Sequence, residues 1–358
     1  AEKVADIRFP EPAPCGRTPI MAKDISKAYG SNIVFAGVNL AIDKGSRVVI
    51  LGYNGAGKTT TLRLLAHIEE PDTGSVEYGH GCKIGYFAQE HDTLDLNATV
   101  LENLQHVAPE LDNTQARSIL GSFLFSGDDA MKPAHVLSGG EKTRLALATL
   151  VTSRANVLLL DEPFSALDYK LRRAMQLEIK RLQRRLGITF VFVTHDQEEA
   201  LTMSDTIVVM NQGYIQQIGT PESIYNEPEN AFVADFIGDS NIIGATMIRD
   251  RLVEILGARF DCVDTGFGEN KPVDVVIRPE DVELVAPEEG IIHGTLTHSI
   301  FKGVHYEMEV MANGFEWLVQ STKMVPVGTK VGIKVDPFNI QIMKKPESED
   351  EEAIGVNE

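Results

Sequence analysis

The chain has 358 residues, 43% of them hydrophobic, and a formal net charge of −19. At roughly 150 residues per domain, this length predicts two domains, each with its own core. The longest apolar runs, such as 156–160 and 188–193, are far shorter than the roughly 20 residues that cross a bilayer, so we expect no membrane-spanning helix. The acidic charge disfavours nucleic acid as a direct partner, because phosphate contacts require Lys or Arg.

The two ends of the chain differ in composition from the rest. Residues 1–19 contain four prolines and no periodicity, which predicts an extended lead-in without the features of a signal peptide. Residues 346–358 are acidic with few apolar side chains, which predicts a disordered tail. Because the three cysteines are few, scattered and odd in number, we expect a protein of the reducing cytoplasm.

Residues 20–238 have the pattern of an α/β domain. Residues 38–42 alternate between apolar and polar side chains, as in a half-exposed antiparallel strand. Residues 47–51 form a strand that leads into a glycine-rich loop. Continuous apolar runs at 156–160 and 188–194 are typical of parallel strands that are covered on both faces.

A helix is predicted between the last two strands, at residues 169–186. Its apolar residues recur at helical spacing, Asp168 is a candidate N-cap, and Gly187 is a natural end. Strand, helix and strand make one crossover unit. The basic side chains near the helix end favour a solvated face over a nucleic-acid site; they are Lys180, Arg181, Arg184 and Arg185.

Residues 239–345 have a different texture. Short alternating runs are separated by Gly, Pro and Asn turns, which predicts a small all-β domain with Trp317 in its core. The predicted strands include 273–277, 282–285, 306–310 and 331–335.

A phosphate-binding loop is predicted at residues 52–59, which read GYNGAGKT and match G-x-x-x-x-G-K-[ST] between a strand and a helical run. The alternative is a simple glycine-rich turn. In the functional reading, glycine amides surround the phosphates, Lys58 reaches the β- and γ-phosphates, and Thr59 binds Mg²⁺. The candidate residues are Gly52, Asn54, Gly55, Ala56, Gly57, Lys58, Thr59 and Thr60.

Two adjacent carboxylates, Asp161 and Glu162, end the apolar strand at 156–160. A single Asp there could be only a cap. A pair at the carboxyl end of a parallel strand lies where α/β sheets bind ligands. We expect Asp161 to hold magnesium and Glu162 to orient and deprotonate the attacking water, because phosphoryl transfer needs positioning and charge neutralisation.

Residues 137–141, LSGGE, precede this strand and resemble the signature loop of ABC ATPases, although a serine before two glycines also suits a helix start. The resemblance implies a P-loop ABC ATPase domain with a RecA-like core, an antiparallel β subdomain and a helical subdomain. In that family, this loop contacts the ATP bound by the other subunit. Because only one phosphate loop occurs here, the implied partner is a second copy. The implied contact residues are Ser138, Gly139, Gly140 and Glu141.

Four further positions match the family. Gln89 resembles the Q-loop glutamine, which contacts magnesium and the attacking water, and Asp168 resembles the D-loop aspartate. His195 resembles the switch histidine, a catalytic residue beside Glu162. Tyr29 resembles the aromatic that stacks on adenine, but Phe35 could take that role, or both could lie in the core.

The chain resembles two branches of the family. Residues 1–160 look like the second ATPase half of an ABC-F protein, a soluble, translation-associated ATPase. From about residue 164 the sequence looks like a polyamine-importer ATPase, and VVIRPEDVEL resembles its OB-like, TOBE-type regulatory domain. We hypothesise a recombinant chain joined near 156–164; the alternative is an importer subunit that has drifted. Residues 89–137 correspond to the groove that receives the permease in importers, so docking is in question.

Three functions follow from these resemblances. The first is a transport ATPase for polyamine uptake, with two copies bound to membrane permease subunits on the inner face of the cell membrane. The second is a ribosome-associated ATPase, and the third is a fusion protein with ATPase activity only. ATP and Mg²⁺ are the expected cofactors in each case.

Overall fold

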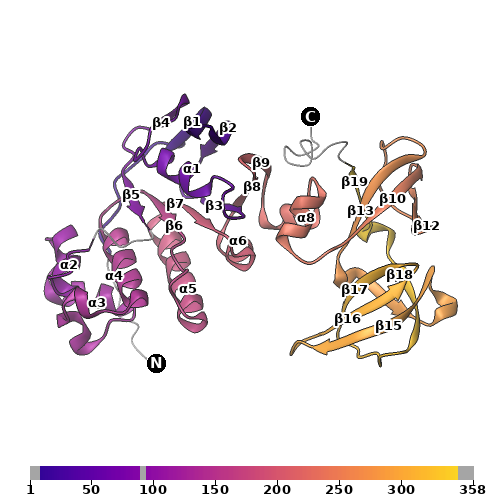
Figure 1. Cartoon of the computed structure of the whole chain (residues 1–358). Helices are drawn as coiled ribbons and strands as arrows, with labels where there is room; N and C mark the ends of the chain where they lie inside the picture. The colour runs from indigo at the N-terminus through magenta and orange to yellow at the C-terminus, as the bar shows by residue number, and fades with distance from the viewer. Residues whose placement is uncertain (1–8, 89–93, 346–358) are drawn as a thin grey trace. The chain divides into compact units, whose positions relative to one another are not determined.

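The computed structural model describes residues 9–88 and 94–345. The chain divides into two compact units between Pro221 and Glu222, and each unit is described by itself (Figure 1). In the part of the chain that is described, no helix is both long and apolar enough to cross a membrane.

A six-stranded sheet in the order β5-β6-β7-β3-β8-β9 forms the centre of the first unit. All its neighbouring pairs are parallel except β8 with β9. Every residue of β3, β6 and β7 is buried, as their continuous apolar runs predict. The strands are β3 Arg47–Gly52, β5 Ile84–Phe87, β6 Val157–Asp161, β7 Thr189–Thr194, β8 Thr206–Asn211 and β9 Tyr214–Gly219.

A second, antiparallel sheet has the order β2-β1-β4, with strands β1 Ile20–Tyr29, β2 Asn32–Ile42 and β4 Thr73–Tyr78. The alternation expected at 38–42 is confirmed: Val38, Leu40 and Ile42 are buried, and the residues between them are exposed. Helix α1, Lys58–Leu65, shares one hydrophobic core with this sheet and with the central sheet. That core holds the phosphate loop between two rigid layers.

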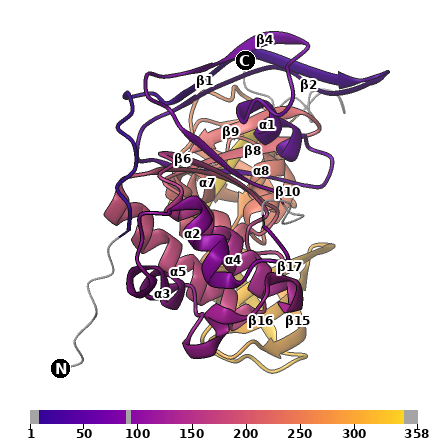
Figure 2. The same ribbon diagram turned by 90° about the vertical axis from the view of Figure 1, so that its left-hand side faces the viewer.

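The first unit also contains helices, and α2, α3 and α4 form a group beside α5 (Figure 2). Their bounds are α2 Val100–Val107, α3 Asn113–Ser122, α4 Gly139–Thr152, α5 Tyr169–Leu186 and α6 Gln197–Met203. Helix α5 has the predicted bounds. The Asp168 carboxylate accepts a hydrogen bond from the Leu171 amide at 3.1 Å, and Gly187 ends the helix at φ 63°.

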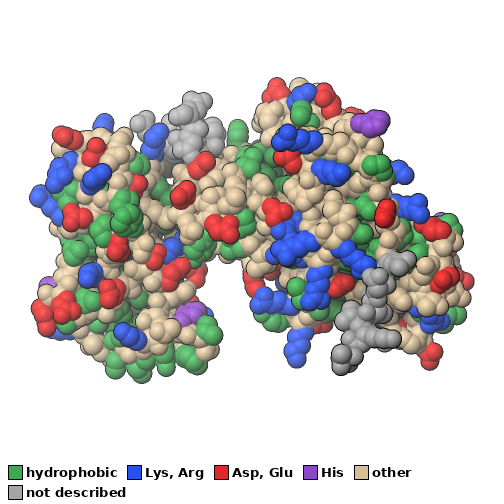
Figure 3. Space-filling model, turned by 180° about the vertical axis from the view of Figure 1, so that it is seen from behind, with side chains coloured by type: hydrophobic (Ala, Val, Ile, Leu, Met, Phe, Trp, Pro, Cys, Tyr) green, Lys and Arg blue, Asp and Glu red, His purple; other side chains and the backbone are tan. Residues whose placement is uncertain are grey.

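Basic and acidic side chains are interspersed on the surface, and Lys and Arg side chains gather on the first unit's face in Figure 3. On α5, several basic groups have acceptors close by. Arg181 lies 3.8 Å from Glu178, and Lys180 donates to the Thr202 carbonyl at 2.6 Å. These contacts suit the solvated face that the sequence predicts.

The described part of the lead-in, residues 9–19, has no helix or strand, and it is fixed to the first unit. The Ala13 amide donates to the Arg154 carbonyl at 3.2 Å, and the Asn156 side chain donates to the Ala13 carbonyl at 2.9 Å. The Gly16 amide donates to the His80 carbonyl at 2.9 Å. The lead-in is therefore part of the first unit, whereas the sequence indicates only an extended segment.

The second unit contains two five-stranded antiparallel sheets around one core, in the orders β12-β11-β10-β13-β19 and β14-β18-β15-β16-β17. Trp317 is fully buried in this core, as expected. The strands are β10 Asn241–Arg249, β11 Leu252–Ile255, β12 Ala258–Asp261, β13 Lys271–Ile277, β14 Val282–Val285, β15 Ile292–Phe301, β16 Tyr306–Ala312, β17 Phe315–Ser321, β18 Lys330–Val335 and β19 Gln341–Lys344.

The boundary between the units differs from the one expected after residue 238. Helices α7, Pro221–Asn226, and α8, Ala231–Ile237, lie with the β domain apart from the first residue of α7. The reason is Arg278, whose buried guanidinium donates to the carbonyls of Tyr225 and Ala234, both at 2.8 Å. These bonds hold both helices on the β domain.

Candidate nucleotide-binding site

The phosphate loop connects β3 to α1 at the carboxyl edge of the central sheet. Gly55 and Gly57 have φ values of 86° and 95°, a region that favours glycine. A Cβ atom at Gly52 would lie 2.4 Å from the Met210 carbonyl oxygen on the neighbouring strand β8. No side chain caps the start of α1, so its first amides stay available for an anion.

Lys58 is almost fully buried at the start of α1. Its Nζ donates to the carbonyls of Gly52 and Tyr53, at 2.8 and 2.9 Å. Burial lowers the pKa of Lys58, while Glu162 and Asp161 raise it. The Lys58 ammonium group thus lies against the backbone of its own loop, and one of its three N–H donors remains for a phosphate.

Thr59 and Asp161 come together, although they are far apart in the sequence. The Thr59 hydroxyl donates to the Asp161 carboxylate at 3.1 Å. Burial raises the pKa of Asp161, an effect that the Thr59 hydrogen bond opposes. A hydroxyl and a carboxylate at hydrogen-bond distance are oxygen ligands of the kind Mg²⁺ prefers, so these residues fit that ion.

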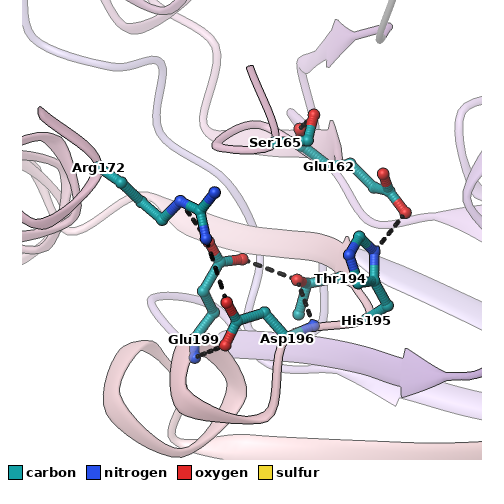
Figure 4. A pocket seen from close by; sticks show the side chains of 7 residues that line it. All are labelled: Glu162, Ser165, Arg172, Thr194, His195, Asp196 and Glu199. Carbon is teal, nitrogen blue, oxygen red and sulfur yellow. Dashed lines mark hydrogen bonds and ion pairs between the residues drawn. The ribbon is translucent and has the colours of Figure 1, made fainter. Parts of the chain in front are cut away.

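Glu162 and His195 form a second pair at the same edge, after the neighbouring strands β6 and β7. His195 Nδ1 lies 3.0 Å from Glu162 Oε1 (Figure 4). Glu162 has a φ of 45°, and its amide donates to the Val193 carbonyl at 3.1 Å. A carboxylate beside an imidazole can orient water and move its proton.

The LSGGE segment forms the start of α4. The Ser138 hydroxyl caps the helix by accepting a hydrogen bond from the Glu141 amide, and the Glu141 carboxylate accepts one from the Ser138 amide at 2.8 Å. The hydrogen bonds from Ser138 lower the pKa of Glu141. A Cβ at Gly140 would lie 3.4 Å from the Ala166 carbonyl, whereas Gly139 faces open space. This loop therefore packs on the segment after β6.

The two aromatic candidates differ in exposure. Tyr29 is 50% exposed and its hydroxyl donates to Glu69, which raises the pKa of Tyr29. Phe35 is only 2% exposed, and its ring lies against the phosphate loop at Gly57. Of the two rings, only that of Tyr29 is exposed enough to stack on a base.

The remaining predicted residues are placed as follows. Asn54 is exposed at the tip of the phosphate loop, and Ala56 is buried with its amide bonded to the Tyr53 carbonyl at 3.2 Å. Thr60 is half-buried on α1. Gln89 lies outside the described residues.

A polar pocket beside His195 is not predicted from the sequence. The residues that line it are Glu162, Ser165, Arg172, Thr194, His195, Asp196 and Glu199 (Figure 4). The motif VTHD points only to the histidine, and Arg172 lies in a helix that reads as a basic surface. Because the contacts join residues of α5 and α6, only the tertiary fold shows them.

Comparison with known proteins agrees with this geometry. The family model described as ABC transporter matches residues 35–165, and the TOBE domain model matches residues 275–343. The ATP-binding cassette MJ0796, solved as a dimer in a post-hydrolysis state with ADP and Pi, is 26% identical with a TM-score of 0.51, over 56% of this chain and 98% of that one. The cbiO1 protein of Clostridium perfringens, part of the ABC transporter complex cbiONQ, is 26% identical with a TM-score of 0.52, over 59% of this chain and 92% of that one.

Two curated relatives match almost the whole chain. The spermidine/putrescine import ATP-binding protein PotA of Acetivibrio thermocellus is 46% identical over 345 residues, 92% of this chain and 97% of the relative. The protein of the same name from Clostridioides difficile is 46% identical over 341 residues, 91% of this chain and 98% of the relative.

Together, the P-loop α/β fold and the site define an ABC-type ATPase that binds and hydrolyses ATP, followed by an all-β, OB-like TOBE domain. The chain belongs to the family of spermidine/putrescine import ATP-binding proteins. The comparisons do not support the ABC-F resemblance or a recombinant origin, because single importer proteins align across the join expected near 156–164.

Proposed function

We propose that this chain is the ATP-hydrolysing subunit of an importer for polyamines of the spermidine and putrescine type. The alignment at 46% identity over 345 residues with a spermidine/putrescine import ATP-binding protein carries this proposal. The alignment covers 92% of this chain, so it includes residues of both the ATPase unit and the TOBE domain.

The contacts of the site support the following proposed roles in hydrolysis. The ammonium group of Lys58 binds the β- and γ-phosphates, which the amides of the phosphate loop surround. Thr59 and Asp161 hold Mg²⁺, which neutralises phosphate charge when bound. Glu162 orients and deprotonates the attacking water, and His195 holds the Glu162 carboxylate at 3.0 Å. Gln89 is proposed to contact the same water and ion.

We infer that two copies bind ATP between them. The start of α4 presents the Ser138 hydroxyl and the amides of Gly139 and Gly140, which precede the Glu141 amide that the serine caps, and helix N-terminal amides favour a phosphate. It packs against the segment of Ala166. Because the resembling loop of ABC ATPases contacts the ATP bound by the other subunit, a phosphate of a second copy is its proposed ligand. Asp168 lies beside it at the start of α5. The dimeric form in which MJ0796 was solved supports this arrangement.

The proposed partners are membrane permease subunits, with the ATPase peripheral on the inner face of the membrane. An uptake assay tests this proposal. Cells that lack their own polyamine-import ATPase but keep its permease would receive this chain, and labelled spermidine uptake would be measured. Restored uptake by the chain, but not by Glu162→Gln, is expected. Co-sedimentation with ribosomes instead of permease would contradict the importer role and favour the ABC-F alternative.

A further inference from the structure

The side chain of Arg172 joins two loops of the catalytic site. Its Nη2 donates to the Leu167 carbonyl at 3.4 Å, and its Nη1 donates to the Asp196 carboxylate at 3.3 Å. Leu167 directly precedes Asp168, and Asp196 directly follows His195. One guanidinium group therefore spans the start of α5 and the loop of the histidine (Figure 4).

The same group of contacts also holds Thr194, the residue before His195. Glu199 is 5% exposed, and one of its oxygens accepts a hydrogen bond from the Thr194 hydroxyl at 2.7 Å. The other oxygen accepts from Gln176 at 3.2 Å and lies 3.9 Å from Arg172 Nε. In addition, the Asp196 amide donates to the Thr194 hydroxyl at 3.0 Å. Both chain neighbours of His195 are thus tied to α5.

His195 itself has little other support. Its side chain is 60% exposed, and its ring contacts the Glu162 carboxylate. The position of the ring therefore depends on the backbone at residues 194–196. A shift of that backbone would change the distance between His195 Nδ1 and Glu162 Oε1, on which the activation of water depends.

We propose that Arg172 is a positioning residue that couples the loop of Asp168 to His195. Arg172 fixes the Leu167 carbonyl before Asp168 and the Asp196 carboxylate after His195, so the His195 ring stays within reach of Glu162. The inference rests on the proposed roles of His195 and Glu162.

The kinetic test compares Arg172→Met with Arg173→Met. Arg173 is the next residue of α5, is exposed, and pairs with Glu198 of α6 at 3.0 Å, so it controls for the loss of a helix-to-helix ion pair. Arg172→Met is expected to lower kcat by up to about 100-fold, which is the effect of a small misplacement at an active site. The Kd of a non-hydrolysable ATP analogue should stay within about twofold of the wild-type value. Arg173→Met should change neither quantity.

Arg172→Lys covers the case in which Arg172→Met fails to fold. The lysine keeps a positive charge near the buried Glu199, but a single amine cannot replace the two separate donors. We expect this variant to melt close to the wild-type temperature and still to lose kcat. Wild-type kcat in the folded Arg172→Lys or Arg172→Met variant would overturn the proposal.

A spectroscopic measurement separates this inference from the proposed function. Ring-labelled histidine gives an NMR signal for His195, assigned by its loss in His195→Gln. The signal should shift in Arg172→Lys and not in Arg173→Met, with or without activity. If the wild-type chain failed to hydrolyse ATP, the proposed function would be wrong, whereas an unmoved His195 signal in Arg172→Lys would refute the positioning role.

Discussion

Replacing Lys58 with methionine tests the phosphate site most selectively, because it keeps the buried stem and removes only the ammonium group. Two of the three donors of Nζ bind the carbonyls of Gly52 and Tyr53, at 2.8 and 2.9 Å. One donor and the charge remain for a phosphate oxygen. A hydrogen bond to a charged group contributes about 1.5–3 kcal/mol, so the Kd for ATP should rise about 10- to 100-fold.

Isothermal titration of the whole chain with a non-hydrolysable ATP analogue and Mg²⁺ measures this loss. Lys44→Met is the matched control, because Lys44 is an exposed lysine outside the phosphate loop. The control should bind as the wild type does. An affinity of Lys58→Met within twofold of the wild type, in a variant with an unchanged melting temperature, would refute the proposed phosphate contact.

Three further substitutions have expected outcomes. Gly52→Ala should lower the melting temperature and weaken ATP binding, because its Cβ would lie 2.4 Å from the Met210 carbonyl; normal melting and binding would contradict this. Since burial raises the pKa of Asp161, the folded chain binds this proton more tightly than the unfolded chain, and stability falls as pH rises through that pKa. At a pH above that pKa and without ligands, Asp161→Asn should therefore raise the melting temperature. The same variant should weaken Mg²⁺-dependent ATP binding, and an unchanged Mg²⁺ dependence would refute the proposed role of Asp161 in holding the ion. Arg278→Met leaves buried carbonyls without their charged donor, so urea unfolding followed by Trp317 fluorescence should show a loss of about 1–3 kcal/mol for each such carbonyl. An unchanged midpoint would show that the guanidinium does not hold the helices.

Local signals in the sequence predicted the first unit well. The bounds of α5 could be predicted because both ends depend on adjacent residues, the cap Asp168 and the left-handed Gly187. The pairing of Thr59 with Asp161, and of Glu162 with His195, follows from parallel strands that end at one edge.

Contacts between distant residues could not be predicted in this way. Arg278 binds carbonyls of helices that lie 44 and 53 residues earlier, so composition alone does not indicate the division between Pro221 and Glu222. Asn156 fixes the lead-in through the Ala13 carbonyl, although proline content alone indicates only an extended segment. Arg172 has the periodicity of a surface residue, and only the fold brings it to Asp196.

The central claim is that Glu162 activates water for the hydrolysis of an ATP that two copies hold between them. Glu162→Gln keeps the shape of the side chain and removes its proton acceptor, so phosphate release should fall by about 10²- to 10⁴-fold. With ATP and Mg²⁺, the variant should still bind nucleotide and should elute as a dimer by size-exclusion chromatography. Phosphate release by Glu162→Gln at the wild-type rate would contradict the account.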